Sequence, residues 1–457
     1  MINLSFDRGT LLLEGSKNLS SSQLPQFKFD ERVKSYRALA SEYREVILHL
    51  IQEKIKFNDQ AKNYTPIDST LVQSITPRHH QEKALEAWLK SGKQGVVSLP
   101  TGAGKTILAI LAIAETQRST LVVVPTIDLL VQWQETLAHY LKQKIGGYGG
   151  GQKEIEAITV ATYESAHRFM PFHGDKFGLV VFDECHHLPA PQYQNIAKAA
   201  IAPFRLGLSA TVDRADGQEV VIYDLIGPLI YEGNINDMVS KVLSPYDVIT
   251  IEVDLSDEEK EEYSQSRKIY TDFIRQQGIN FSSPRGWMDF VMRSSRSENG
   301  RAAMKAYRRQ KQIANGSANK IAELWKIISQ HQDDKIIVFT DENRFAYQIG
   351  TELLLPVLTH HTKAKERKAI LQSFRTGELR VIVTSKVLNE GVDVPDANVG
   401  VVLSGSGAVR EHVQRLGRIL RFQPGKRAIL YEVMSKGTGE TFVSKRRREH
   451  HAYKRSH

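Results

Sequence analysis

The sequence predicts an α/β protein with two parallel-sheet domains, an N-terminal module and a helical insert in the second domain. Short β-branched apolar runs alternate with helical stretches from residue 94 onward. Such runs are typical of a parallel sheet that helices cover on both faces. The alternation forms two series, and 457 residues correspond to several domains at roughly 100–200 residues each.

The elements follow in order along the chain. The first series predicts strands at residues 95–99, 120–124, 158–161, 179–182 and 205–208, with helices at 106–115 and 128–140. The second predicts strands at 335–339, 380–383, 399–403 and 428–433, with helices at 343–354 and 365–376. The predicted domains are residues 1–70 (the module, with a helix at 41–55), 71–243 and 244–457. Residues 256–330 interrupt the last domain with charged, helix-like sequence.

Composition excludes several classes of protein. With 41% hydrophobic and 25% charged residues, the chain is an ordinary globular protein and not a disordered one. A single cysteine excludes a disulfide framework and a cysteine-based zinc site, and it fits a reducing cytosol. The longest apolar run, residues 107–114, is far shorter than the roughly 18 residues of a membrane span. Because residues 1–15 lack a secretory signal pattern, we expect a cytoplasmic, nucleoid-associated protein without a membrane partner.

The net charge of +9 is unevenly distributed. Residues 267–311 contain 11 Lys and Arg against 3 Asp and Glu, and residues 441–457 contain 6 against one. These segments carry +8 and +5, so the rest of the chain is slightly acidic. The pattern suggests a polyanionic partner, although a solvated surface with a basic tail would look the same.

A glycine-rich sequence, LPTGAGKT at residues 99–106, follows a predicted strand and opens a predicted helix. Backbone N–H groups in such a turn bind phosphate oxygens, helped by the helix N-terminus. Lys105 would reach the β- and γ-phosphates and Thr106 would bind Mg²⁺. The backbone cradle would comprise Thr101, Gly102, Ala103 and Gly104. Leu99 replaces the usual first glycine, and the alternative interpretation is a simple glycine-rich turn.

An acidic pair ends the strand predicted at residues 179–182. Asp183 would hold Mg²⁺ through water, and Glu184 would orient or deprotonate the attacking water. Taken alone, two adjacent acids are more often a solvated turn. Upstream, Gln81 could pair with the N6 and N7 atoms of adenine. Arg78, in the same segment, is a further candidate for nucleotide binding.

The second domain contains two further segments of interest. Arg418 and Arg421 lie three residues apart, so they share a helix face and could stabilise charge on the γ-phosphoryl group. Gln414, which begins the same run, is a further candidate catalytic residue. The alternative for the whole run is a basic surface helix. The segment TSKVLNEGVD at residues 384–393 follows a strand and suits contact with nucleotide and polymer, or a strand–helix loop capped by Thr384. Its candidate ligands are Gly391 and Asp393.

Taken in order, the segments TGAGKT, DECH, SAT, TSKVLNEGVDV and QRLGRILR resemble the superfamily 2 helicases. The resemblance covers residues 75–435 and implies two RecA-like domains with ATP between them. It further implies that His186, Ser209 and Thr211 couple hydrolysis to strand movement.

A closer resemblance, to the XPB family of DNA repair and transcription translocases, rests on IAPFRLGLSAT at residues 201–211, VPDANVG at 394–400 and LSGSG at 403–407. It implies a damage-recognition module at residues 1–70 and a thumb-like insert at about 256–315, where the +8 segment lies. The aromatic residues there could stack on bases or form a small helical core. The family's Arg-Glu-Asp element corresponds to residues 214–216, where Ala215 replaces glutamate. Candidate DNA contacts are Arg214, Asp216, Thr384, Trp287 and Arg293.

The resemblance implies an ATP- and Mg²⁺-dependent DNA helicase of 3′→5′ polarity, working as a monomer on single-stranded, forked or damaged DNA. Archaeal relatives work with a nuclease, so a similar partner is expected. Two alternatives remain: a double-strand translocase that separates strands poorly, as Ala215 suggests, and a non-enzymatic factor that binds damaged DNA. RNA is a weaker option because nothing in the sequence indicates recognition of a 2′-hydroxyl.

Overall fold

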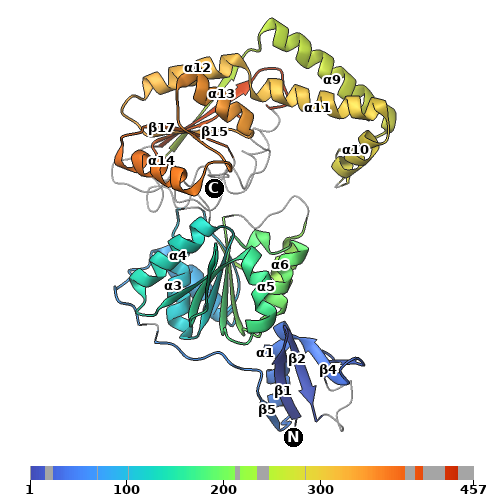
Figure 1. The fold of residues 1–457 in the computed structure, drawn as a ribbon, viewed down its shortest axis with the longest axis vertical. Helices are drawn as coiled ribbons and strands as arrows, with labels where there is room; N and C mark the ends of the chain where they lie inside the picture. The colour runs from blue at the N-terminus through green and yellow to red at the C-terminus, as the bar shows by residue number, and fades with distance from the viewer. Residues whose placement is uncertain are drawn as a thin grey trace. The chain divides into compact units, whose positions relative to one another are not determined.

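The computed structural model describes residues 2–15, 24–68, 70–100, 102–210, 217–233, 246–281, 283, 285–385, 397–404 and 428–440. The chain divides into two compact units, Met1–Gly233 and Asn234–His457 (Figure 1). Each unit contains its own sheet built mainly of parallel strands and its own hydrophobic core. The predicted α/β class with parallel sheets is therefore confirmed.

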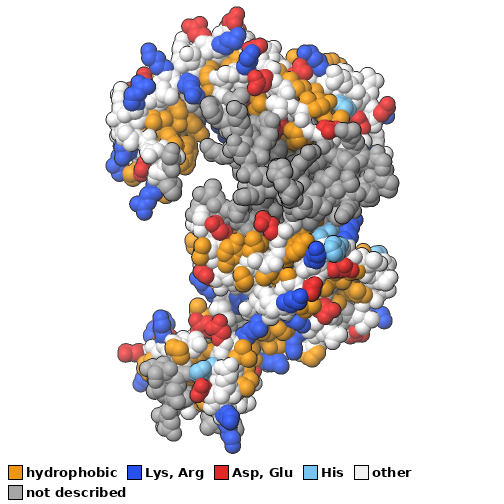
Figure 2. Space-filling view, turned by 180° about the vertical axis from the view of Figure 1, so that it is seen from behind, with side chains coloured by type: hydrophobic (Ala, Val, Ile, Leu, Met, Phe, Trp, Pro, Cys, Tyr) orange, Lys and Arg blue, Asp and Glu red, His pale blue; other side chains and the backbone are white. Residues whose placement is uncertain are grey.

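The described surface is mixed in character. Within the described part of the chain, no helix is long and apolar enough to span a membrane. Figure 2 shows positive and negative side chains interspersed over one face of both units, with hydrophobic side chains in small groups between them. Scattered surface hydrophobic residues are usual on folded proteins.

The N-terminal module is a sheet in the strand order β3-β4-β2-β1-β5, with a helix packed on it. Leu4 and Leu11 are buried under α1 because a sheet with one covered face buries alternate residues. The elements are β1 (Ile2–Asp7), β2 (Thr10–Glu14), β3 (Lys28–Asp30), β4 (Ser35–Leu39), the 3₁₀ helix η1 (Ala40–Glu42), α1 (Tyr43–Gln52) and β5 (Phe57–Asp59). The helix expected at residues 41–55 is present but shorter, whereas the strands were not predicted.

The module packs against the larger sheet of its unit. Ile201, which precedes β12 of that sheet, is buried in the core of the module. Arg44 Nη1 donates to the carbonyl oxygens of Gly92 at 2.9 Å and Pro203 at 3.2 Å. These contacts join the module to the rest of the first unit.

The large sheet of the first unit has the strand order β13-β6-β12-β11-β7-β10-β8-β9. Every described pairing is parallel except that of β9 with β8. The strands are β6 (Gln94–Ser98), β7 (Thr120–Val124), β8 (Ile145–Gly149), β9 (Gln152–Glu154), β10 (Ile158–Thr162), β11 (Leu179–Asp183), β12 (Phe204–Ser209) and β13 (Leu229–Glu232). The helices are α2 (His79–Lys90), α3 (Lys105–Thr116), α4 (Ile127–Tyr140), α5 (Tyr163–His173), the 3₁₀ helix η2 (Cys185–His187), α6 (Pro191–Lys198) and α7 (Glu219–Ile226).

The five strands predicted in this domain from apolar runs all occur within one residue of their expected limits. All residues of β7, β10 and β11 are buried, because helices cover both faces of the sheet. The sequence missed β8, β9 and β13. Strand β8 reads IGGYG and β9 reads QKE, so neither carries an apolar run, and β13 has no buried residue.

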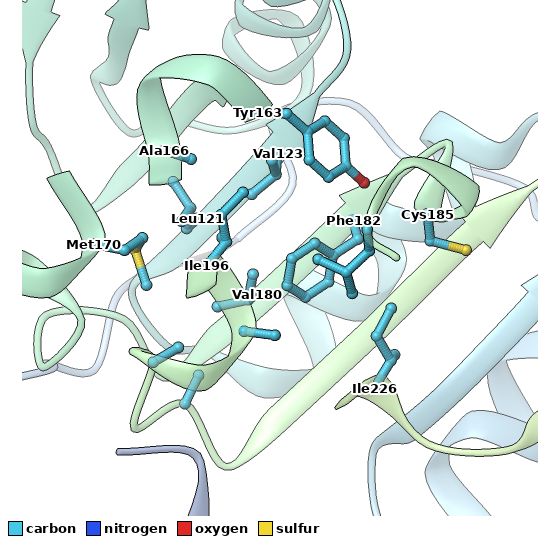
Figure 3. Packing of buried hydrophobic residues seen from close by; sticks show 14 of the residues in the cluster. Leu121, Val123, Tyr163, Ala166, Met170, Val180, Phe182, Cys185, Ile196 and Ile226 are labelled. Atoms are coloured by element: carbon cyan, nitrogen blue, oxygen red, sulfur yellow. The ribbon is translucent and has the colours of Figure 1, made fainter. Parts of the chain in front are cut away.

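One hydrophobic cluster packs beneath α5 and α6 (Figure 3). Val123 of β7 and Phe182 of β11 meet Tyr163 and Met170 of α5 there. Cys185 belongs to the same cluster and is fully buried, which raises the pKa of its thiol. This cysteine therefore serves packing.

The second unit contains an all-parallel sheet in the order β14-β19-β18-β15-β17-β16. Its strands are β14 (Tyr246–Val253), β15 (Ile336–Phe339), β16 (Val357–Leu358), β17 (Val381–Thr384), β18 (Val399–Val402) and β19 (Ala428–Ser435). Helices α12 (Ala318–Gln330), α13 (Asn343–Leu353) and α14 (Ala364–Thr376) belong to the same domain. Ile321, Leu324 and Ile327 of α12 are buried against this sheet, so the interruption expected over residues 256–330 ends before α12. Strands β14, an edge strand with alternating polar residues, and β16, only two residues long, were not predicted.

The insert consists of α9 (Asp257–Gln277), α10 (Gly286–Ser295) and α11 (Glu298–Asn315), with α9 and α11 packed along each other (Figure 1). Helix α9 begins with a capping box between Ser256 and Glu259. Phe273 and Phe290 are buried in a small hydrophobic core of the insert. For these two aromatic residues the structure therefore agrees with the helical core and not with stacking on bases. Trp287 is 47% exposed, and its ring centroid lies 5.2 Å from that of Tyr307.

Candidate active site

The glycine-rich turn lies at the carboxyl end of β6 and leads directly into α3. Gly102 and Gly104 have φ angles of 86° and 87°, the left-handed region that glycine adopts without a steric penalty. Gly104 is the N-cap of α3, so the unpaired N–H groups of the first helical turn lie beside it. Such a turn offers backbone donors and the positive end of a helix dipole to an anion.

Helix α2 supports this turn from behind. His80 Nε2 lies 2.7 Å from the carbonyl oxygen of Ala103, and burial lowers the pKa of His80. Gln81 Nε2 donates to the carbonyl oxygen of Gly104 at 3.1 Å, while Gln81 Oε1 accepts from the backbone N–H of Arg78 at 2.8 Å. A Cβ at Gly104 would lie 2.3 Å from Gln81 Nε2, so a side chain there would displace Gln81 and also strain the backbone at a φ of 87°. In this structure both polar ends of Gln81 bind backbone, and contact with adenine requires their release.

The acidic pair lies at the carboxyl end of β11, two strands away from β6 in the sheet. Asp183 Oδ2 accepts a hydrogen bond of 2.9 Å from Trp133 Nε1, and Asp183 Oδ1 accepts one of 3.0 Å from the N–H of Glu184. Burial and the charge of Glu184 raise the pKa of Asp183 to about 6, against the opposing effect of Lys105. The Asp183 carboxylate is therefore fixed in direction, and the charge of Lys105 offsets its burial only in part.

Lys105 and Glu184 form a nearly buried ion pair. Lys105 Nζ lies 2.7 Å from Glu184 Oε1, and the two side chains are 11% and 12% exposed. Burial disfavours the charged form of each, but the attraction outweighs it: the pKa of Glu184 is lowered and that of Lys105 is raised. Glu184 also has a φ of 48°, a left-handed backbone that is uncommon for a residue with a side chain. This geometry turns its carboxylate toward the glycine-rich turn.

Ser209 at the end of β12 connects the two motifs. His186 Nδ1 lies 3.1 Å from Ser209 Oγ and 3.4 Å from Glu184 Oε2. The backbone N–H of Leu99, just before the turn, donates to the carbonyl oxygen of Ser209 at 2.9 Å. Parallel strands bring these residues together because their carboxyl ends share one edge of the sheet, with Ser98 opposite Ser209 and Leu208 opposite Asp183.

The structure thus brings together Lys105, Asp183, Glu184, His186 and Ser209. Thr106 is the second residue of α3 and is partly buried, at the turn that carries Gly102, Ala103 and Gly104. Several predicted site residues lie outside the described residues: Thr101, Thr211, Arg214, Asp216, Gly391, Asp393, Gln414, Arg418 and Arg421. Their roles stay predictions.

The candidate DNA contacts that are described differ in accessibility. Trp287 is about half exposed on α10. Arg293 Nη1 donates to the carbonyl oxygen of Gln277, at the end of α9. Thr384 is fully buried and its hydroxyl donates to the carbonyl oxygen of Ser385 at 3.0 Å, so this side chain is not offered to DNA as predicted.

Two site residues were missed at the level of sequence. Trp133 on α4 holds the Asp183 carboxylate, and Tyr163 on α5 donates to the Asp183 carbonyl oxygen at 3.0 Å. Each is buried on the inner face of its helix, where an aromatic residue is usual and carries no motif. Their polar tips are the only local signal, since a buried Trp N–H or Tyr O–H requires a partner.

A phosphate-binding turn, a facing acidic pair and a parallel sheet define a P-loop nucleoside triphosphatase. The fold is that of a helicase domain: the chain is similar to the crystal structure of the Pyrococcus furiosus Hef helicase domain, with a TM-score of 0.54 and 19% identity. The similarity covers 81% of this chain and 98% of that one. The family model described as "Type III restriction enzyme, res subunit" matches residues 74–214.

More specific matches identify the family. The model described as "ERCC3/RAD25/XPB C-terminal helicase" matches residues 300–453, and that of the XPB damage recognition domain matches residues 4–61. The "DNA 3'-5' translocase XPB2" of Sulfurisphaera tokodaii is 38% identical over 98% of this chain and 100% of its own length. The "DNA 3'-5' helicase XPB" of Mycobacterium tuberculosis is 31% identical over 79% of this chain, which spans 60% of that longer protein. The chain belongs to the XPB family of helicases.

Proposed function

We propose that this protein is a DNA-dependent ATPase that couples hydrolysis of Mg·ATP to 3′→5′ movement along DNA and to strand separation, in DNA repair. The observation that carries the proposal is the buried Lys105–Glu184 pair beside Asp183, at the edge of the sheet where the phosphate-binding turn lies. The family membership supports both the polarity and the polymer, because the two relatives described above are named as 3'-5' enzymes acting on DNA.

The described residues fit a nucleotide with a divalent cation. The turn of Gly102 and Gly104 presents backbone donors, and the charge of Lys105 compensates the buried Asp183 carboxylate only in part. Thr106 and Asp183 would hold Mg²⁺, which neutralises phosphate charge when bound. Lys105 would bind the β- and γ-phosphates, and this transfer breaks its pair with Glu184.

Glu184 is freed as a base only when Lys105 turns to the phosphates. Before that exchange, the ammonium group lowers the pKa of the carboxylate and makes it a poor proton acceptor. After it, Glu184 would orient and deprotonate water, with Arg418 and Arg421 stabilising the charge on the γ-phosphoryl. Glu184 would therefore stay a poor base until ATP is bound. The contact of His186 with Ser209 would pass the change at Glu184 to β12.

The ATPase rate with single-stranded, duplex and forked DNA, at two salt concentrations, tests this proposal. We expect stimulation by DNA that weakens steeply with salt, because neutralised phosphates release counterions. Lys105→Ala should abolish the stimulated rate. Wild-type turnover in that variant would refute the site, and equal stimulation by RNA would refute the choice of DNA. Equal repair activity from the ATPase-dead variant would instead favour a non-enzymatic recruitment factor.

A double-strand translocase that unwinds poorly is the second candidate. Ala215 stands where the family carries a glutamate linked to strand separation, and the Sulfurisphaera relative is named a translocase. A forked-duplex unwinding assay beside a triplex-displacement assay separates the two functions. Strong displacement without unwinding would establish translocation as the main activity. The proposal further includes a monomeric, cytoplasmic enzyme on the nucleoid with a nuclease partner; sedimentation and co-purification from the source cell test these points.

A further inference from the structure

A cavity of about 260 Å³ lies in the second unit, where the insert joins the sheet. Helices α9 and α11 form one wall, and the carboxyl ends of β18 and β19 form the other. The first helix contributes Tyr263, Arg267 and Tyr270, spaced along one face, and the second contributes Tyr307 and Gln310. The cavity is therefore built from two elements that are far apart in the sequence.

Its position is one where open α/β sheets bind ligands. From β15 the chain runs to β16 and β17 on one side, and it then returns to β18 on the other side, so the strand order reverses between β15 and β18. Ser404 lines the cavity and its Oγ accepts from the N–H of Asp341, which follows β15, at 2.9 Å. Ligands of open sheets bind outside the carboxyl ends of the strands, at such a reversal.

Two buried amide groups in the lining have unused hydrogen-bonding atoms. Gln310 is 6% exposed and Asn315 is 5% exposed. Among the residues that the structure describes, Gln310 Oε1 and Asn315 Nδ2 have no hydrogen-bond partner. A buried polar atom without a partner costs about 1–3 kcal/mol, so native proteins keep few of them. One unused acceptor and one unused donor therefore point to a ligand that supplies both.

The charged side chains of the lining differ between the mouth of the cavity and its interior. Arg267 is exposed, and its guanidinium donates to the Tyr263 hydroxyl at 3.2 Å. Lys311 pairs with Asp341 at 2.8 Å and the partly buried Glu440 pairs with Lys320 at 2.7 Å, whereas the buried Glu432 adds a carboxylate to the lining. A phosphate group is favoured beside Arg267 and disfavoured deeper in the cavity, where a planar group with amino donors fits.

We propose that this cavity binds one unstacked nucleobase of the DNA strand, beside the tyrosine rings and against the amides of Gln310 and Asn315. The inference rests on the proposed function, because it presumes DNA as the polymer. Tyrosine rings stack on any base, and a volume just under the roughly 300–1,000 Å³ of small-molecule sites admits a single nucleotide unit.

We assign the occupant to a strand and not to a free nucleotide because the same helix also carries a basic track on another face. Arg301, Lys305 and Arg308 follow one another on α11 and line a groove of about 700 Å³ beside α10. Spacings of four and three residues place them on one face of α11, different from the face of Tyr307 and Gln310, where they can bind successive phosphates of a strand that leaves the cavity. A free nucleotide has no use for such a track.

An abasic scan of the full-length protein tests the proposal. Single-stranded oligonucleotides with one abasic position each, moved along the bound region, are measured for affinity. One position should weaken binding by about tenfold relative to its neighbours, the loss expected for one stacked base. Gln310→Leu should remove this sensitivity without lowering the melting temperature, because it deletes an amide that lacks a partner.

Two further variants complete the test. Ala314→Leu fills the cavity from α11 and should flatten the scan in the same way, whereas Gln276→Leu, on the exposed surface of α9, should leave it unchanged. A flat scan in the wild-type chain with DNA-stimulated ATPase intact would overturn this inference alone. Absence of any DNA stimulation would overturn the proposed function with it. Binding of free dAMP or dCMP that Gln310→Leu abolishes, together with a flat scan, would identify a nucleotide effector instead.

Discussion

Removing Lys105 should destabilise the first unit as well as abolish hydrolysis, and the loss of stability should grow with pH. The substitution Lys105→Ala leaves Glu184 facing the glycine-rich turn beside Asp183, with two adjacent carboxyl groups and no cation. Breaking a buried ion pair costs about 3–5 kcal/mol and an exposed one about 0–1. At 11% and 12% exposure the pair is nearly but not fully buried. We therefore expect a loss of stability between the two ranges and nearer the buried one, about 2–3 kcal/mol.

The sign of the pH dependence follows from the two pKa directions. In the wild-type chain the pKa of Glu184 is lowered, so the pair stabilises the fold above the ordinary pKa and this contribution is lost only in acid. Without Lys105, we expect burial and mutual repulsion to raise the pKa of both carboxyl groups, against the opposing effect of His186 on Glu184. Their cost is then largest at alkaline pH and is relieved as the pH falls toward the raised pKa.

Thermal unfolding at about pH 6 and about pH 8 measures both effects. For a unit of this size the loss corresponds to a fall of roughly 4–10 °C in melting temperature, larger at the higher pH. The double variant Lys105→Ala/Glu184→Gln should recover most of the stability but none of the ATPase activity. Lys90→Ala, which breaks an exposed pair with Glu86, is the matched control and should change stability by less than about 1 kcal/mol. Equal destabilisation at both pH values, or no recovery in the double variant, would refute the reasoning.

Three other substitutions address separate parts of the site. Gln81→Ala removes hydrogen bonds to the turn at Gly104, so the KM for ATP should rise about tenfold in steady-state assays; an unchanged KM would mean that the turn needs no such support. His186→Ala breaks the contact with Ser209 and should reduce the stimulation by DNA at least about tenfold while basal hydrolysis persists; parallel loss of both rates would contradict a coupling role. Arg418→Ala should lower kcat by about 10³ or more with DNA affinity unchanged, and a small effect on kcat would exclude it from the transition state.

Sequence by itself determined the fold class and most strands of both sheets. Strands such as β7 and β11 could be predicted because a strand buried on both faces is a continuous apolar run. Strands of other composition were not predicted, because they contain no continuous apolar run. Strand β8 has three glycines, and β14 at the sheet edge alternates polar with apolar residues. The phosphate-binding turn and the acidic pair were also determined locally, since glycine backbone freedom and adjacent carboxylates are properties of short segments.

Only the tertiary structure decided how these segments combine. The order β6-β12-β11 puts Lys105 within 2.7 Å of Glu184, although 79 positions separate them in the chain. It also recruits Trp133 to the Asp183 carboxylate and buries Thr384, neither of which any motif indicates. The cavity beside Gln310 likewise exists only because α9 and α11 meet the ends of β18 and β19. The physical reason is the same in each case: residue type sets what a side chain can do, whereas strand order and helix packing set what it can reach.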